Sequence, residues 1–182
     1  FRLTYLTNCV LNDPVFERGI RDFLAVCNVV KTFRNMRILQ ISTRPYEFWS
    51  TMCNEGELLE KFNIQLTPIP MPELTDEMKK AKEQGEEVAK VMQYCRENME
   101  ICIKENELEN VAALKVAMKN LIQKYGCQAA AIQCWNQLQK EIGIMPCAAN
   151  ALLNEEGIPV VCETDIHGAI TALLVEAAAL DD

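Results

Sequence analysis

The sequence IPVVCETDIHG occupies residues 158–168 and joins a short apolar run to a polar loop and a glycine. The run from Ile158 to Cys162 predicts a buried strand, because β-branched residues next to turn formers are typical of one. An apolar helical pattern follows from Gly168 to Leu180. A strand, a polar loop and a helix in this order form the unit from which parallel α/β sheets are built.

The same alternation of strands and helices recurs along the rest of the chain. We expect strands at residues 37–42, 64–69 and 127–133, and shorter helices at 57–62, from Trp135 onward and at 147–154. Strands that alternate with helices indicate a parallel sheet covered by helices on both faces. The expected fold class is therefore α/β, a three-layer Rossmann-like (flavodoxin-like) domain with a parallel sheet.

Two longer helical regions accompany the predicted sheet. Asp13 and Pro14 form a helix start, and the residues that follow place five apolar side chains on one helix face: Phe16, Ile20, Phe23, Cys27 and Val30. From Pro72 to Gly126 the pattern is helical throughout, with apolar stripes that predict core packing. We expect residues 1–182 to form a single α/β domain with a helical lead-in at about 14–35 and a helical insert at about 72–126.

The two ends of the sequence indicate a piece of a longer protein. The chain begins at Phe1 without a methionine and ends with Asp181 and Asp182, directly after an apolar helical stretch. We therefore expect this domain to be excised from a longer multi-domain protein.

Composition excludes several classes of protein. Hydrophobic residues make up 49% of the chain and charged residues 24%, which is typical of an ordinary globular protein. The formal net charge of −8 argues against a nucleic-acid partner, since binding to phosphates depends on a basic surface. No apolar run approaches the roughly 18 residues that a membrane span requires, so we expect no membrane segment.

Nine cysteines first suggest a disulfide framework, but their pattern favours free thiols. The number is odd, no CxxC pair occurs, and the single histidine, His167, cannot complete a zinc-finger pattern. Most of the cysteines lie among apolar neighbours. We expect buried free cysteines and a reducing, cytoplasmic location.

Three predicted loops follow strands and are candidates for a ligand site, because ligands of open parallel sheets bind beyond the carboxyl ends of the strands. The first contains Arg44, which could clamp an anionic or polyhydroxylated ligand or could be a surface arginine. The second contains Trp135, which could wall a pocket or could simply pack. The third is residues 163–168.

The third loop carries the most chemistry. Glu163, Asp165 and His167 lie two residues apart, and in an extended segment this spacing places all three side chains on one side. Two carboxylates and an imidazole are good ligands for Mn²⁺ or Mg²⁺. The alternative is that Asp165 caps the next helix while Glu163 is merely solvated.

Several segments of the sequence match one family of sugar enzymes. The most specific is VCETDIHGAIT at residues 161–171, and further matches are TRPYEF at 43–48, AIQCW at 131–135, MPC at 145–147 and NEEGIP at 154–159. From about Arg37 to Leu180 the chain resembles the L-fucose isomerase and L-arabinose isomerase family, especially its fucose-isomerase-like branch.

The resemblance implies the middle domain of a three-domain aldose–ketose isomerase, an intramolecular oxidoreductase acting with Mn²⁺ on a pentose or 6-deoxyhexose such as L-fucose or L-arabinose. It implies that the metal holds two sugar oxygens while carboxylates move a proton between C1 and C2 through an ene-diol. By motif position, Asp165 would be a metal ligand and the acid/base, with Glu163 as its alternative or companion. Arg44 and Trp135 are the candidate sugar-binding residues. It also implies a homo-oligomer.

The match to this family is incomplete. The family supplies a further acidic ligand from the loop that here reads Gln133-Cys134-Trp135, and a histidine from a C-terminal domain that follows this segment. A non-catalytic sugar-binding module and an oligomerisation module therefore stay as alternatives to an isomerase domain.

We predict that the 182-residue chain alone has no isomerase activity, because it supplies only part of the implied metal site. The measurement is an assay of the purified chain with Mn²⁺ and a panel of pentoses and 6-deoxyhexoses. Real turnover of any of these sugars would contradict the prediction.

Overall fold

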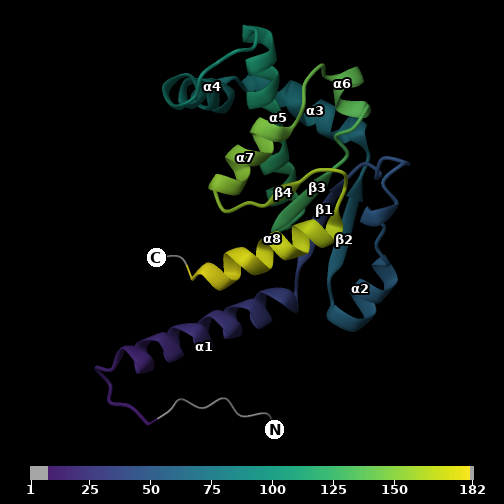
Figure 1. Cartoon of the computed structure of the whole chain (residues 1–182). Helices are drawn as coiled ribbons and strands as arrows, with labels where there is room; N and C mark the ends of the chain where they lie inside the picture. The colour runs from purple at the N-terminus through teal and green to yellow at the C-terminus, as the bar shows by residue number, and fades with distance from the viewer. Residues whose placement is uncertain (1–7, 181–182) are drawn as a thin grey trace.

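Four parallel strands form one sheet in this computed structural model, which describes residues 8–180 (Figure 1). Their order across the sheet is β2-β1-β3-β4, and their bounds are Arg37–Ile41 for β1, Gln65–Ile69 for β2, Ala129–Ile132 for β3 and Val160–Val161 for β4. Strand β1 pairs with β2 on one side and with β3 on the other, so that Ile41 lies opposite both Ile69 and Ile132. The sheet confirms the expected α/β fold class.

The strand order places a switch point at the centre of the sheet. From β1 the chain crosses to β2 on one side, and it then returns to the other side of β1 to form β3. In sheets of this flavodoxin-like order, the loops after the two central strands diverge to opposite faces and leave room for a ligand between them. Here those loops follow Ile41 and Ile132.

Helices connect the strands and cover the sheet. Their bounds are Pro14–Phe33 (α1), Glu55–Phe62 (α2), Met71–Gln84 (α3), Glu86–Asn98 (α4), Glu105–Lys124 (α5), Gln137–Glu141 (α6), Cys147–Glu155 (α7) and Ile166–Ala179 (α8), with a 3-10 turn, η1, at Trp49–Thr51. Among these helices none combines the length and hydropathy that crossing a bilayer requires.

Alternate residues of the strands enter two separate cores, which makes the structure three-layered. Leu39 and Ile41 of β1 pack with α3, α5 and α7, whereas Ile38 packs on the other face with α2 and α8. Helix α1 lies outside α8, and Asn28 Nδ2 donates to the carbonyl of Ala177 at 2.8 Å. Figure 1 shows α8 between α1 and the sheet.

Helix α5 is the most enclosed helix of the described chain. Every residue from Val111 to Met118 is buried, because α3, α4, α7 and the sheet surround the helix. The buried set includes Lys115, whose ammonium forms an ion pair with Glu156. Lys119 Nζ reaches the other oxygen of the same carboxylate at 2.6 Å, so the buried charge is paired.

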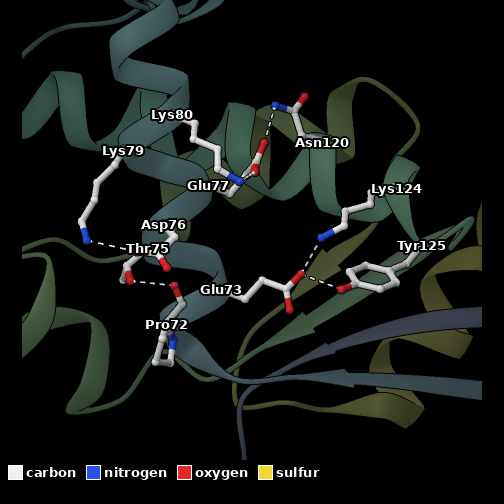
Figure 2. Close-up of polar contacts among 10 residues, drawn as sticks. All are labelled: Pro72, Glu73, Thr75, Asp76, Glu77, Lys79, Lys80, Asn120, Lys124 and Tyr125. Atoms are coloured by element: carbon white, nitrogen blue, oxygen red, sulfur yellow. Dashed lines mark hydrogen bonds and ion pairs between the residues drawn. The ribbon is translucent and has the colours of Figure 1, made fainter.

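Polar contacts join α3 to the end of α5, as Figure 2 shows. Glu73 Oε1 accepts hydrogen bonds from Lys124 Nζ at 2.8 Å and from Tyr125 Oη at 2.6 Å. One turn along, Asn120 Nδ2 donates to Glu77 Oε1 at 3.2 Å. Lys124, and secondly Tyr125, hold the pKa of the Glu73 carboxyl below its ordinary value.

The structure adds detail to two expectations from the sequence, the helical segments at about 14–35 and 72–126, and corrects a third, the burial of the cysteines. The segment 72–126 is not one continuous helix, because α3 ends at Gly85, which has φ of 73°, and residues 99–104 separate α4 from α5. Helix α1 begins at Pro14 with Asp13 as its cap, but none of its residues is buried, and Phe23 is 50% exposed. All nine cysteines are free, yet only Cys95 and Cys134 are buried.

We predict that Glu73→Gln lowers the free energy of unfolding by about 0.5–1 kcal/mol at pH 7, the usual range for a partly exposed ion pair. Because the pKa of Glu73 is lowered by folding, its contribution is present above the ordinary glutamate pKa and is lost as the pH falls through the lowered value. The variant and the parent should therefore converge in acid. Urea unfolding at pH 7 and near pH 3 measures this, with the exposed Glu83→Gln on the same helix as control; a difference that persists in acid would contradict it.

Candidate functional site

The loops after β1, β3 and β4 meet at the switch point of the sheet. Ser42 Oγ, after β1, donates to Gln133 Oε1, after β3, at 2.7 Å. Thr164, after β4, donates its hydroxyl to the carbonyl of Thr43 at 3.1 Å and its N–H to the carbonyl of Ile132 at 3.1 Å. The structure thus brings together the three loops that the sequence nominated.

A pocket of about 270 Å³ lies between the loop after β1 and the start of α8. Polar groups on its wall include Thr43, Arg44, Glu55 and Thr164. A larger hollow of about 720 Å³ lies at the opposite end of β4, where the α7–β4 turn meets α8. Size alone therefore does not select a site, whereas the meeting of polar loops selects the smaller pocket.

Arg44 lines this pocket, but part of its guanidinium is already used. Nη1 donates to the carbonyls of Pro45 and Tyr46, each at 3.2 Å, and the guanidinium carbon lies 5.1 Å from the ring centre of Trp49. These contacts hold the loop after β1 in shape. Arg44 is thus neither a free clamp nor a plain surface arginine.

Trp135 lies beside the pocket and is not among the residues that line it. Its ring is 49% exposed and meets the ring of Phe48 edge-on, with centroids 5.8 Å apart. The structure therefore does not place Trp135 and Arg44 in one pocket. Trp135, which is exposed, and Phe48, which is half-buried, instead form an aromatic pair next to it.

The loop after β4 is a tight turn and not an extended segment. Glu163 and Thr164 both have left-handed backbones, with φ of 57° and 53°, and the N–H of Asp165 donates to the carbonyl of Cys162 at 3.1 Å. The prediction that an extended backbone places Glu163, Asp165 and His167 on one side is therefore wrong. Strand β4 ends at Val161, before these residues begin.

Asp165 caps helix α8, as the alternative interpretation of this loop expected. Its Oδ1 accepts the N–H of Gly168 at 3.0 Å. A Cβ at position 168 would lie 2.7 Å from Asp165 Oδ2, so glycine is needed for this close approach. His167 is exposed in the first turn of α8.

Sequence reasoning missed a cluster of two thiols and a carboxylate. Cys134 Sγ donates to Glu163 Oε1 at 3.3 Å, and the ligand atoms of Cys134, Cys162 and Glu163 all lie within 4.8 Å of one another. Cys134 follows one predicted strand and Cys162 is the last residue of another, which was the available signal. The order of the strands, which makes β3 and β4 neighbours, was not predicted.

The two thiols of this cluster have pKa values that are shifted in opposite directions. A hydrogen bond from Cys162 lowers the pKa of the Cys134 thiol below its ordinary value. The same contact, together with burial, raises the pKa of the Cys162 thiol. Cys134 is therefore the thiol of the pair that ionises first.

The cluster does not fit the Mn²⁺ ion that the family resemblance implies. Mn²⁺ prefers oxygen donors, whereas this cluster supplies two sulfurs and one carboxylate. Within residues 8–180, this cluster is the one place where three or more cysteine, histidine or acidic side chains lie close enough to surround an ion. Asp165 is not part of it. The described chain thus does not gather Asp165 and Glu163 into an oxygen-rich site.

Comparisons with known proteins relate the chain to sugar isomerases. No protein-family model matches it. It is 27% identical over 166 residues to the sulfoquinovose isomerase of Alkalicoccus urumqiensis, covering 90% of this chain and 37% of that protein. It is 26% identical over 163 residues to that of Priestia megaterium, covering 90% and 36%, and 24% identical over 183 residues to that of a Clostridium species, covering 93% and 38%.

These relatives support the family resemblance at the level of sugar isomerases and do not select its fucose-isomerase-like branch. The chain spans less than two fifths of the length of the curated relatives it matches. Its similarity nevertheless extends over nine tenths of the chain, and so includes the sheet and the loops that meet at its edge.

We predict that Glu163→Gly is more stable than Glu163→Ala by about 1 kcal/mol, because alanine is strained at the left-handed φ of this position and glycine is not. Urea unfolding of the two variants measures the difference. The matched control is Glu87 in helix α4, where the glycine variant should be the less stable by about 1 kcal/mol. If the glycine variant were less stable than the alanine variant at residue 163 as well as at residue 87, the turn would not hold residue 163 in this conformation.

Proposed function

We propose that this chain is the substrate-binding domain of an aldose–ketose isomerase. The observation that carries the proposal is the meeting of three polar loops at the switch point, in a chain that is similar to sugar isomerases along most of its length. The relatives' name makes sulfoquinovose, a sugar that carries a sulfonate, the first substrate to test, beside L-fucose and L-arabinose.

Asp165 is the group to which we assign proton transfer. It stands between Thr164 and Ile166, which both line the pocket, and its charge acts on Cys53 in the same wall. Isomerisation moves a proton between C1 and C2 of the open sugar, and a carboxylate within reach of both carbons can accept and return it. The hydrogen bond from Gly168 fixes the orientation of this carboxylate.

Sugar binding is assigned to the walls of the pocket. Hydroxyl groups of a sugar would find donors and acceptors in Thr43, Gln40 and Arg44. The exposed ring of Trp135 and the half-buried ring of Phe48 offer an apolar surface for the carbon skeleton beside the pocket. Glu163 is the companion carboxylate of Asp165 in this proposal.

A divalent cation such as Mn²⁺ would need more than these two carboxylates. We place its remaining ligands outside residues 8–180, and no step above passes through the ion. We further propose that the protein is a homo-oligomer and that it is cytoplasmic. The free state of all nine cysteines supports the second proposal, because disulfides are rare in reducing compartments.

The test uses the complete protein that contains this chain. We expect Asp165→Asn to lower kcat by about a hundredfold or more, the usual contribution of a general acid or base. Asparagine is as good a helix cap as aspartate, so the variant keeps the hydrogen bond that starts α8 and loses the basic carboxylate. Steady-state kinetics on the three sugars provide the readout.

Asp76→Asn, on the exposed side of α3, is the control for this experiment and should leave kcat unchanged. Full kcat in Asp165→Asn would overturn the role of Asp165. A complete protein that binds these sugars and turns none of them over would favour the alternative of a non-catalytic sugar-binding module.

A further inference from the structure

Cys134, Cys162 and Glu163 form a compact set of ligand atoms at the ends of neighbouring strands. Cys134 lies two residues beyond β3, and Cys162 directly follows β4. All of their ligand atoms lie within 4.8 Å of one another, and the Cys134 Sγ to Glu163 Oε1 distance is 3.3 Å. Cys134 is 1% exposed, while the other two are partly exposed, so the cluster is protected on one side and reachable on the other.

A buried amide oxygen beside the cluster lacks a hydrogen-bond partner among the described residues. Asn150, on helix α7, is 6% exposed, and its Nδ2 lies 3.4 Å from Cys162 Sγ. Its Oδ1 has no hydrogen-bond partner among the described residues. A buried polar atom without a partner costs about 1–3 kcal/mol, so an unpaired oxygen at this place indicates a missing ligand. A flip of the Asn150 side-chain amide, which exchanges the positions of Oδ1 and Nδ2, would bring Oδ1 to the Cys162 thiol.

We propose that Cys134, Cys162 and Glu163 bind a Zn²⁺-class cation, with Asn150 Oδ1 or a water as the fourth ligand. Tetrahedral Zn²⁺, with bonds of about 2.3 Å to sulfur and 2.0–2.2 Å to oxygen, holds sulfur and oxygen ligands about 3.6 Å apart. The Cys134 to Glu163 distance of 3.3 Å is already close to this value. Small side-chain rotations suffice for the remaining ligands.

The donor types decide which cation is bound. Two thiolates select a soft or borderline ion such as Zn²⁺ over Mn²⁺ and Mg²⁺, which prefer oxygen. The ion would tie the loop after β3 to the loop after β4 and would fix Glu163 in its left-handed turn. The site does not include Asp165, but it shares Glu163 with the isomerase proposal. Metal binding is read on the chain without any sugar, so this proposal can fail while the isomerase proposal stands, and the reverse.

Co²⁺ is the probe for the experiment, because it replaces Zn²⁺ and its bonds to thiolates absorb in the near ultraviolet. The 182-residue chain, reduced and freed of metal with a chelator, is titrated with Co²⁺ alone. We expect saturation at one ion per chain, with near-ultraviolet thiolate absorption and the visible bands of tetrahedral Co²⁺. One equivalent of Zn²⁺ should remove this absorption, and excess Mn²⁺ should not.

Variants assign the signal to residues. Cys134→Ser and Cys162→Ser should each reduce the thiolate absorption by about half, since each removes one of two sulfur ligands. Glu163→Gln should weaken Co²⁺ binding at least about tenfold while keeping two thiolates. The controls Cys102→Ser and Cys127→Ser, which change an exposed thiol and a partly buried thiol outside the cluster, should leave the Co²⁺ absorption unchanged.

Three outcomes would overturn the proposal. The first is a reduced parent chain that shows no thiolate absorption with Co²⁺, a result that does not depend on any variant folding. The second is absorption that falls equally in the control variants. The third is displacement of Co²⁺ by Mn²⁺ as readily as by Zn²⁺, which would identify an oxygen-rich site.

Discussion

Parallel pairing of β1 with β3 is the interaction on which the rest of the structure depends. It aligns Ile38 with Ala129 and Ile41 with Ile132, and so it places the ends of two strands, separated in the chain by β2 and four α-helices, at one edge. The alanines of β3 are fully buried between the two cores, and their small side chains let α5 and α8 approach the sheet from opposite sides. The two-sided burial of the central strands is typical of parallel sheets.

The polar edge of the sheet is held by backbone geometry as much as by side chains. Two consecutive non-glycine residues in the left-handed region are costly, and such conformations persist where the surroundings fix them. Here Thr164 is buried and bonded through both its N–H and its hydroxyl to the neighbouring loops. The turn that presents Glu163 and Asp165 is therefore a rigid part of the fold, suited to orienting carboxylates.

The sequence allowed the fold class to be predicted, because buried strands and amphipathic helices have distinct periods. It also marked the three polar loops, since each follows an apolar run. The shape of the loop after β4 was missed, because spacing implies an extended backbone, while the turn at 162–165 is held in place by the bonds that Thr164 donates to the carbonyls of Ile132 and Thr43. The thiol cluster was missed for the same reason, since Cys134 and Cys162 meet only through the order of the strands. Helix α1 shows the opposite limit: its apolar spacing predicts a helix correctly without determining what the helix packs against.

The complete burial of the middle of α5 limits where the length of this domain can change. The helix serves as the inner wall of one layer, so the sheet loses its cover if the helix is shortened or removed. Residues 85–104 are different: they contain exposed turns on both sides of α4 and lie farther from the strands. Changes of length over evolution, and any engineered fusion or circular permutation, are therefore best accommodated at Gly85 and at residues 99–104, while α5 is retained as a fixed boundary.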